Sequence, residues 1–300
     1  MAFSAQDVKE LREITGCGMM DCKKALTEAD GDKDKAVELL REKGLATAAK
    51  KAGRIASEGI VKTLVDGKIG VLVEVNSETD FVAKNEEFLT FVENIAKTIA
   101  KENPADVEAL KGMAMVGGEG TVGDELTAKI AKIGENMNIR RFARIETDGV
   151  VVEYTHAAGK IGVLVEAAAE DSDKTRECLR NVAMQVAALS PKYLAVEDIP
   201  QDYRDHEKEI LIAQLKNDPK NANKPAEIIE KMITGRLAKE FKEVCLLEQE
   251  YVKAENKENV AKYVASVGGI TLKQYVRFET GEGLEKKEDN FAEEVASMMK

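Results

Sequence analysis

An eight-residue segment occurs twice in this chain of 300 residues, letter for letter. Gly67-Lys-Ile-Gly-Val-Leu-Val-Glu74 recurs as Gly159-Lys-Ile-Gly-Val-Leu-Val-Glu166. Each copy follows a β-patterned run, at 59–65 and 150–155, across a short turn that contains glycine. This arrangement is typical of a β-hairpin. An identical repeat in matching surroundings indicates that one structural unit is built twice.

The two halves also continue alike after the repeated octamer. A helix-patterned stretch comes next, at 86–101 and at 174–189, and a later strand surrounds an Arg-Phe pair, at 139–145 and at 275–279. We therefore predict an α+β protein with two homologous subdomains, each a three-stranded antiparallel sheet with helices packed on one face. The expected boundaries are 59–146 for core subdomain N and 147–280 for core subdomain C.

The segment before the duplication has the pattern of a small helical bundle over residues 1–45. Ser4 is placed to cap its first helix, and Gly44 is expected to end the third. The expected helices are 4–13, 20–29 and one that starts at 32 or 34. Bundles of this length resemble ubiquitin-associated (UBA) domains. An Ala- and Lys-rich helical linker is expected over 46–58, and a C-terminal helical module over 281–300 with its helix at 289–299.

Core subdomain C carries an insertion over 201–247 with two long helical patterns around a polar tip at 217–225. The pattern predicts an antiparallel coiled-coil hairpin. Its expected facing residues are Tyr203, Ile210 and Leu215 on one helix and Ile229, Met232, Ile233 and Leu237 on the other. Because a small subdomain offers little core for such a hairpin, we expect it to project.

The charge pattern excludes several classes of function. The formal net charge is −11, and acidic and basic residues are interspersed. Phosphate-backbone binding needs clustered Lys and Arg, so we expect no direct nucleic-acid contact; docking onto a basic protein surface fits better. No signal-peptide pattern and no apolar run of membrane-spanning length is present, and four cysteines are too few for a disulfide framework. We expect a cytoplasmic protein with no membrane contact.

The motifs that could indicate a cofactor or a metal site lack the neighbouring residues that such sites need. Gly118-Glu-Gly-Thr-Val-Gly123 matches a dinucleotide-binding pattern, but no strand precedes it and Glu119 would repel a phosphate, so a flexible surface loop is expected. No phosphate-binding G-x-x-x-x-G-K-[ST] motif occurs. Cys17 and Cys22 lack nearby zinc ligands and are expected to be buried or half-buried thiols. We predict no cofactor, no metal site and no enzymatic reaction.

Asp80 and Phe81 stand out, because an acid and a large apolar ring follow the end of a strand. Two interpretations remain open: Phe81 covers the subdomain core while Asp80 caps the following helix, or the ring is a probe that enters a partner. Met19 and Met20 adjoin a glycine-bracketed turn. Two adjacent helical residues cannot face the same interior, so we expect one in the core and one exposed, where methionine suits an adaptable interface. His156, at the turn of the second hairpin, is expected to be solvated.

Two longer motifs carry a family resemblance. Glu74-Val-Asn-Ser-Glu-Thr-Asp-Phe-Val-Ala-Lys-Asn85 and Leu11-Arg-Glu-Ile-Thr-Gly-Cys-Gly-Met-Met-Asp-Cys-Lys-Lys-Ala-Leu26 resemble the two signatures of the elongation factor Ts family. The resemblance covers nearly the whole chain and includes Ile139-Arg-Arg-Phe142 and Val276-Arg-Phe-Glu-Thr-Gly-Glu-Gly283. The family is the guanine-nucleotide exchange factor of elongation factor Tu (EF-Tu).

The resemblance implies roles for individual residues. Thr79, Asp80, Phe81 and Val82 would insert near the nucleotide-binding helices of EF-Tu and disturb its Mg²⁺ site, so that GDP is released. Further contacts to EF-Tu would come from Met19, Met20 and His156. The hairpin resembles the family's dimerisation module, which is compatible with a homodimer or a 2:2 complex with EF-Tu.

Two other classes of function compete with this reading. A UBA-like and coiled-coil adaptor would tether partners without changing nucleotide release, and it leaves the duplicated subdomains unexplained. A thiol- or metal-dependent enzyme would need Cys17 and Cys22 exposed, with a low thiol pKa or a bound metal.

Overall fold

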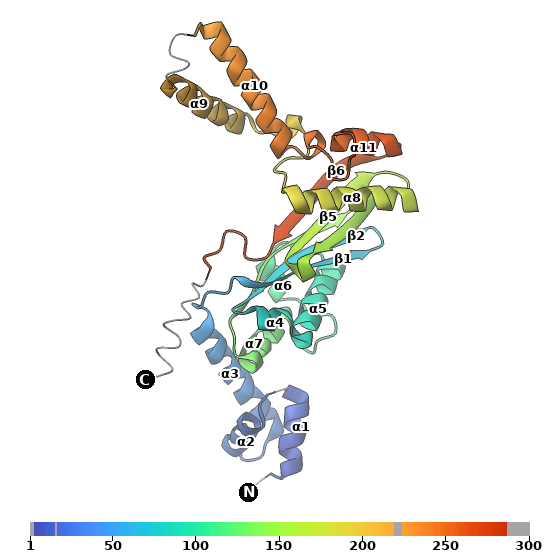
Figure 1. Ribbon diagram of the computed structural model, residues 1–300. Helices are drawn as coiled ribbons and strands as arrows, with labels where there is room; N and C mark the ends of the chain where they lie inside the picture. The colour runs from blue at the N-terminus through green and yellow to red at the C-terminus, as the bar shows by residue number, and fades with distance from the viewer. Residues whose placement is uncertain (1–2, 16, 219–223, 287–300) are drawn as a thin grey trace.

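The computed structural model describes residues 3–15, 17–218 and 224–286. Figure 1 shows an elongated molecule, with a helical bundle at its N-terminal end, two sheets and their helices in the middle, and a helical hairpin that projects at the opposite end. The predicted projection of the hairpin is thus confirmed. Among the described residues, none of the helices combines the length and the apolar character needed to cross a bilayer.

The N-terminal half contains the bundle and the first sheet with its helices. The bundle consists of α1 (Ala5–Thr15), α2 (Met19–Glu28) and α3 (Lys33–Lys51). The strands of the first sheet are β1 (Glu58–Asp66), β2 (Ile69–Ser77) and β3 (Met137–Glu146). Between β2 and β3 lie α4 (Asp80–Ala83), α5 (Glu86–Glu102), α6 (Val107–Lys111) and α7 (Val122–Ile133).

The C-terminal half contains the second sheet, the hairpin and the remaining helices. Its strands are β4 (Val150–His156), β5 (Ile161–Ala168) and β6 (Thr271–Glu279). The helices are α8 (Asp173–Leu189), α9 (Gln201–Asn217), α10 (Ala226–Val244) and α11 (Val260–Val267). Short 3₁₀ turns are η1 (Ala157–Gly159), η2 (Val196–Asp198) and η4 (Leu246–Glu248).

Within the described residues the strands form two three-stranded antiparallel sheets, ordered β1-β2-β3 and β4-β5-β6. The repeated octamer supplies the central strand of each sheet, and the register to the third strand shifts at the same place, after Glu74 and after Glu166. The strands and the pairing predicted from the duplication are therefore confirmed.

The central strands are buried on both sides, because the two sheets also pack against each other. On β2, Val71, Val73 and Val75 join the core beneath α5, whereas Leu72 faces the second sheet. Leu72 meets Leu164 of β5 in a separate apolar cluster between the sheets. The order of layers is helices, sheet, sheet, helices. Alternation within a strand shows two apolar faces, but it does not show which element covers each face, and the stacking was not predicted.

The expectation that Gly44 ends the third helix is wrong. Helix α3 continues to Lys51 and takes up much of the predicted linker. Glycine costs about 1 kcal/mol inside a helix, but here it allows close packing: a Cβ atom on Gly44 would lie 3.7 Å from Cβ of Ala131 on α7. An ion pair between Arg41 and Asp124 adds to this contact. Helix α3 therefore joins the bundle directly to the first sheet's helices.

The glycine-rich pattern Gly118–Gly123 begins in a surface loop, as expected, but this loop, residues 112–121, is closed on itself and the pattern ends inside α7. An antiparallel bridge links Ala114 to Thr121, and Met115 is buried. Thr121 and Asp124 form a reciprocal capping box at the start of α7. The helix therefore begins at Val122.

The hairpin is formed by α9 and α10 as predicted, with a different face inward on α9. Leu211 and Leu215 are buried, and Ile233 is buried on α10. Ile210 is exposed, so its predicted inward position is wrong: the pair one turn apart, Leu211 and Leu215, forms the contact face instead. Tyr203 joins the pair by donating a hydrogen bond to Glu240. The predicted helix at 289–299 and part of the hairpin tip lie outside the described residues.

Candidate functional site

The site begins where β2 ends. Thr79 is the N-cap of the one-turn helix α4, and its hydroxyl accepts a hydrogen bond from the Val82 amide. Val82 and Ala83 face inward and are buried in the core of the first sheet. Phe81 points outward and is 81% exposed. Of the two interpretations left open, the one in which Phe81 covers the core is wrong.

Asp80 does not cap the following helix. It occupies the first turn of α4 and pairs with Lys84 at 2.6 Å, while Asn85 caps α5. The hydrogen bond from Lys84 lowers the pKa of Asp80 below its usual value, and the charge of Lys160 adds to the effect. Asp80 is therefore an ionised, accessible carboxylate beside an exposed aromatic ring.

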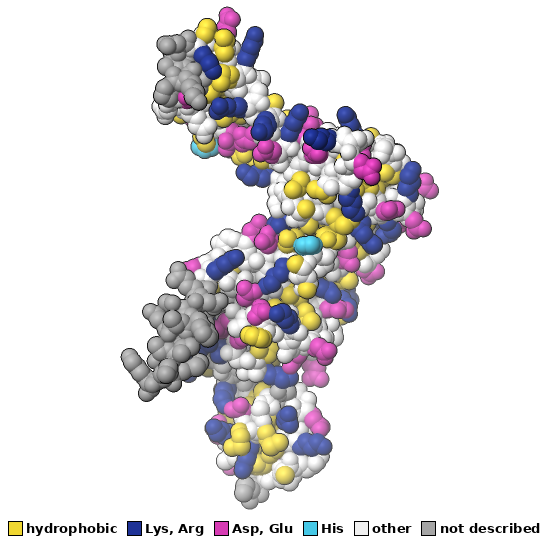
Figure 2. Space-filling view, in the orientation of Figure 1, with side chains coloured by type: hydrophobic (Ala, Val, Ile, Leu, Met, Phe, Trp, Pro, Cys, Tyr) yellow, Lys and Arg dark blue, Asp and Glu magenta, His cyan; other side chains and the backbone are white. Residues whose placement is uncertain are grey.

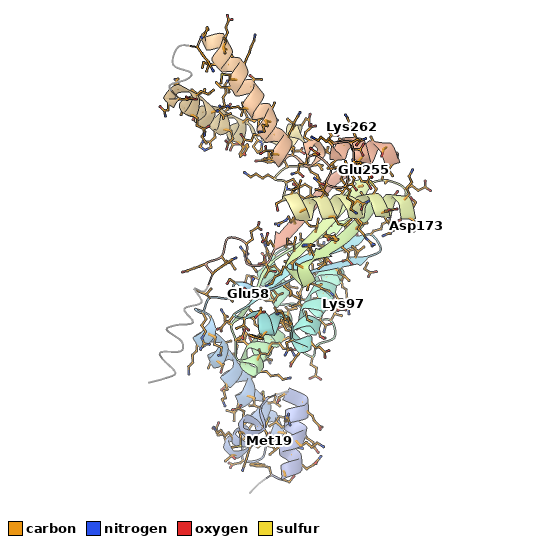
Figure 3. The ribbon with its side chains drawn as sticks, viewed as in Figure 1. Met19, Glu58, Lys97, Asp173, Glu255 and Lys262 are labelled. Carbon is orange, nitrogen blue, oxygen red and sulfur yellow. The ribbon has the colours of Figure 1, made fainter. Side chains whose placement is uncertain are left out.

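The turn of the second hairpin packs against β1, the strand that α4 also contacts, and a Cβ atom on Gly159 would lie 3.3 Å from Ile60 Cβ. This turn presents His156, which is exposed and shares a hydrogen bond of 3.1 Å between its Nδ1 and the hydroxyl of Tyr154. Lys160 also pairs with Glu58 at the start of β1; Glu58 is labelled in the body of the molecule in Figure 3. The expectation of a solvated His156 is confirmed, and its turn packs against the same strand as α4.

The bundle contributes a second apolar surface. Met19 is 59% exposed and Met20 is 63% exposed, so the expectation that one of them is in the core is wrong. The core face of α2 is formed by Cys22, Ala25 and Leu26 instead. Figure 3 shows Met19 on the bundle, well away from the sheets. Exposed methionines form an adaptable contact surface.

The thiols of the bundle match the expectation. Cys22 is buried and Cys17 is half-buried. Burial raises the pKa of the Cys22 thiol, so it is protonated and unreactive at neutral pH. The thiol-dependent reading, which needs both cysteines exposed with a low pKa, does not fit this environment.

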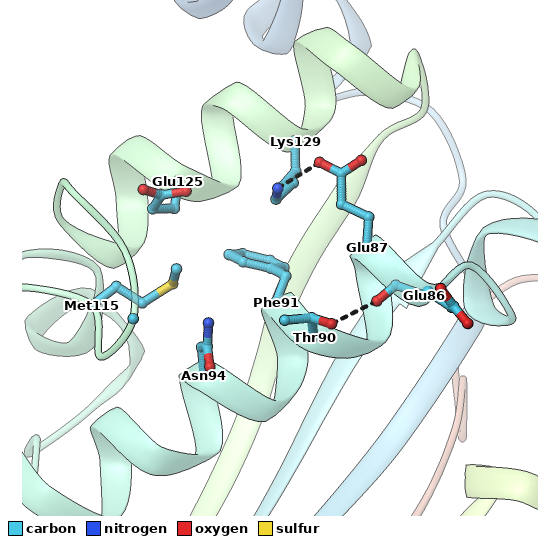
Figure 4. Close-up of a pocket in the computed structure, with 9 residues that line it drawn as sticks. Glu86, Glu87, Thr90, Phe91, Asn94, Met115, Glu125 and Lys129 are labelled. Carbon is cyan, nitrogen blue, oxygen red and sulfur yellow. Dashed lines mark hydrogen bonds and ion pairs between the residues drawn. The ribbon is translucent and has the colours of Figure 1, made fainter. Parts of the chain in front are cut away.

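A pocket of about 400 Å³ lies between α5 and α7 (Figure 4). Figure 4 shows Phe91 pointing from α5 into the space beside Met115. Glu87 pairs with Lys129 at its rim, and Glu125 accepts a hydrogen bond from the backbone of the glycine-rich loop. Because these carboxylates are engaged within the chain, we place the functional site at α4 instead of here.

Charges of both signs are interspersed over the face drawn in Figure 2. Apolar side chains gather on that face in patches on the bundle and near the junction of the two sheets. On α4, the exposed Phe81 ring and the neighbouring Asp80 carboxylate make the candidate site, and aromatic rings of this kind are common at the energetic centres of protein interfaces.

The chain is similar to known proteins over its whole length. A family model described as "Elongation factor TS" matches residues 78–282. The chain is 51% identical to elongation factor Ts of Clostridioides difficile (strain 630), with 99% of each chain covered. It is 53% identical to that of Clostridium novyi (strain NT), over 99% of this chain and 98% of the relative, and 49% identical to that of Syntrophotalea carbinolica, over 100% of both.

The chain belongs to the elongation factor Ts family. The resemblance carried by the two motifs is thus confirmed, and the chain is a translation elongation factor with the family's role in nucleotide exchange on EF-Tu. The family model includes α4, β3 and the whole of the second sheet, and the similarity to full-length elongation factor Ts proteins extends over β1, β2 and the bundle as well.

Thr79, Asp80, Phe81 and Val82 come together in one helical turn, whereas Met19 and Met20 lie on the separate bundle. Only Phe81 of the four presents most of its side chain to solvent, since Val82 is buried and Thr79 is hydrogen-bonded within the chain. Sequence reasoning missed the groups that hold this turn, Glu135 and Asn136. No local signal identifies them, because their partners lie 56 and 58 residues away.

Proposed function

We propose that the exposed ring of Phe81 is the element with which this protein promotes GDP release from EF-Tu. The observation that carries the proposal is the 81% exposure of a phenylalanine on a one-turn helix whose neighbours Val82 and Ala83 are buried. Burying such a ring in a partner gains about 1.5–3 kcal/mol. Each tenfold acceleration needs about 1.4 kcal/mol, so Phe81 alone accounts for one to two powers of ten.

Asp80 supplies the electrostatic part of the proposal. Its carboxylate is held ionised beside Phe81 and projects from the same turn. Mg²⁺ bridges and neutralises the phosphates of a bound nucleotide. A carboxylate brought near that ion accepts hydrogen bonds from its surroundings and competes for it, so the hold on GDP weakens.

Thermodynamic linkage relates the binding of GDP to EF-Tu to the binding of this protein to EF-Tu. If this protein weakens GDP binding to EF-Tu, GDP weakens the binding of this protein by the same factor. The protein is therefore released when nucleotide binds again, and it makes or breaks no covalent bond. It acts as an exchange factor and not as an enzyme.

Further contacts hold the strained complex together in this proposal. Met19 and Met20 give the bundle an apolar surface for EF-Tu, and His156 adds a polar group near α4. The exposed Ile210 and Ile228 on the projecting hairpin support self-association, as a homodimer or within a 2:2 complex. We place this activity in the cytoplasm, with no cofactor and no direct nucleic-acid contact. In this architecture the bundle is a UBA-like module and the sheets are homologous subdomains.

The test is the release rate of fluorescent GDP from EF-Tu, measured with the protein, with Phe81→Ala and with neither. Leu89→Ala, at a residue of α5 that is 39% exposed, is the matched control. We expect strong acceleration by the protein and by the control, and a rate at least tenfold lower for Phe81→Ala. Acceleration that survives Phe81→Ala would move the mechanism to other contacts. Binding without acceleration would revive the adaptor reading, which family membership disfavours.

A further inference from the structure

The turn Gly134–Asn136, between α7 and β3, grips the base of α4. The carboxylate of Glu135 accepts two hydrogen bonds from Thr79, one from its amide at 3.0 Å and one from its hydroxyl at 2.7 Å. Thr79 in turn accepts from the Val82 amide as the N-cap of α4. A chain of hydrogen bonds therefore runs from Glu135 through Thr79 into the helix that bears Phe81.

Asn136, the next residue of the turn, holds Glu78, the residue before Thr79 in the motif. The Asn136 amide donates to Glu78 Oε1 at 2.6 Å, and Glu78 lies next to Arg54 with an N–O distance of 3.5 Å. The stretch from Glu78 to Thr79 is thus fixed at successive positions by Glu135 and Asn136. The other contacts that orient α4 are the inward packing of Val82 and Ala83 and a hydrogen bond from the Ser77 hydroxyl to the Thr79 carbonyl.

The same turn also holds the end of α3. The Asn136 side chain donates to the carbonyl of Arg54 at 2.8 Å, and Lys51 Nζ donates to the carbonyl of Gly134 at 2.5 Å. Helix α3 belongs to the bundle that carries Met19. The turn Gly134–Asn136 therefore contacts both Thr79, which caps the helix of Phe81, and the end of α3, the helix that belongs to the bundle.

A helix of a single turn has no stability of its own, because nucleation is unfavourable and few internal hydrogen bonds form. The direction of the Phe81 ring must therefore come from tertiary contacts. An interface side chain that is ordered before binding avoids an entropy cost on docking. Thr79 donates two hydrogen bonds to one carboxylate, and hydrogen bonds to ionised groups are stronger than those between neutral groups.

We propose that Glu135 is a positioning residue for nucleotide exchange: by gripping Thr79 it fixes the direction of Phe81 relative to the bundle. This inference rests on the proposed function of Phe81. It assigns Thr79 an internal role, as the link between Glu135 and α4, in place of direct contact with the partner. In this role Glu135 acts through Thr79 and α4.

The experiment measures fluorescent GDP release from EF-Tu over a range of protein concentrations. The variants are Glu135→Ala, the isosteric Glu135→Gln, Phe81→Ala, and Glu135→Ala combined with Phe81→Ala. The control Glu108→Ala removes a carboxylate that is 82% exposed on α6. Thermal unfolding of each variant identifies the temperature range in which all are folded.

We expect Glu135→Ala to lower the maximal release rate roughly two- to tenfold, the range that corresponds to ordering one side chain. Glu135→Gln keeps one acceptor oxygen and should fall between Glu135→Ala and the unchanged protein. The control should match the unchanged protein. Most decisive is the combined variant: if Glu135 acts through Phe81, it should be no slower than Phe81→Ala alone.

Three outcomes would overturn the inference. The first is that EF-Tu releases GDP as fast with Glu135→Ala and Glu135→Gln as with the unchanged protein, but slowly with Phe81→Ala. Glu135 then has no positioning role, and the proposed function stands. If the combined variant loses rate additively, Glu135 acts independently of Phe81. If Phe81→Ala itself has no effect, the proposed function of the ring fails, and the inference fails with it.

Discussion

Gly162 of β5 leaves the space that Leu72 of β2 occupies. A Cβ atom on Gly162 would lie 2.7 Å from Leu72 Cδ1 and 2.6 Å from Val61 Cγ1. The relationship is reciprocal, since a Cβ atom on Gly70 of β2 would lie 3.4 Å from Leu164 Cδ1. The glycine and leucine of each octamer thus meet those of the other copy, and the repeated sequence forms both sides of one interface.

Gly162→Ala should therefore destabilise the fold by about 1–3 kcal/mol, the usual cost of overpacking a dense core. Both nearby side chains are almost fully buried and have little room to move. Gly70→Ala should cost less, because only one atom, Val151 Cγ2, would come within 3.0 Å of the new Cβ, at 2.8 Å. Urea unfolding monitored by circular dichroism measures both free energies.

Gly235→Ala is the control for that comparison. Nothing lies within 4 Å of the position its Cβ would take, and it lies on the exposed side of α10. Alanine is favoured over glycine inside a helix by about 1 kcal/mol, so this variant should be more stable. Equal effects at Gly162 and Gly70 would contradict the asymmetry of the interface.

The octamer also shows what the sequence can and cannot predict about this fold. Its strands and hairpins follow from local patterns, and the structure has them where the patterns place them. The stacking of the sheets depends on which apolar face meets which, and Val71 and Leu72 do not differ in sequence character although they face opposite layers. The prediction that Gly44 ends the third helix was wrong for a similar reason. The role of Gly44 depends on its close packing against Ala131, which is distant in sequence.

Glu74 is the buried charge that ties the first sheet to the segment after β6. Its side chain is fully buried and accepts hydrogen bonds from Arg141 Nε at 2.6 Å, Arg140 Nη1 at 3.0 Å and the Gly281 amide at 2.8 Å. Removing one partner of a buried ion pair costs about 3–5 kcal/mol. Because the two arginines are partly exposed, we expect Glu74→Gln to cost about 3 kcal/mol at pH 7, measured by urea unfolding.

The same site predicts a pH dependence. Burial alone would raise the pKa of Glu74, but the hydrogen bonds from Gly281, Arg141, Asn76 and Arg140 outweigh it and lower the pKa below the usual 4.5. The folded state then binds its proton less tightly than the unfolded state, so this contribution to stability is fully present above about pH 4.5. It is lost as the pH falls through the folded-state pKa. The gap between the unchanged protein and Glu74→Gln should narrow on acidification, and a constant gap would refute this account.

The site was less predictable than the strands. The motif marked Asp80 and Phe81, but the direction of the ring depended on whether Val82 and Ala83 would fill the core, which the structure shows they do. Met19 and Met20 are both exposed because the inward face of α2 begins at Cys22. In both cases the sequence located the turn, and long-range packing decided which side chains it presents.

The turn that presents His156 carries backbone strain. Ala157 and Ala158 adopt positive φ angles of 49° and 53°. For residues with a Cβ atom this region costs roughly 1–2 kcal/mol each. Ala158→Gly removes that cost at an exposed position, so we expect a gain of about 0.5–1 kcal/mol after the greater freedom of glycine in the unfolded chain is counted.

Ala213→Gly, at an exposed position inside α9, serves as the control for this substitution. The same chemical change should destabilise that helix by about 1 kcal/mol. Thermal and urea unfolding of the two variants should therefore show opposite signs. A loss of stability at both positions would mean that the turn is not strained as described.

The bundle surface and the Phe81 ring should affect exchange in different ways. Met19 and Met20 are 59% and 63% exposed, so the combined substitution Met19→Ala and Met20→Ala should change the free energy of unfolding by less than about 0.5 kcal/mol. If they contact EF-Tu in the complex, losing both should weaken binding roughly tenfold or more, because buried contacts of this kind carry about 1–2 kcal/mol each. Loss of uniform binding raises the concentration for half-maximal exchange and leaves the maximal rate unchanged.

Phe81→Ala should instead lower the maximal rate, because in our proposal the ring acts only in the strained complex. Titrating each variant against fluorescent GDP release separates the two effects, with Leu89→Ala as the common control. A lower maximal rate for the methionine variant, at unchanged half-saturation, would mean that the bundle takes part in opening the nucleotide site itself.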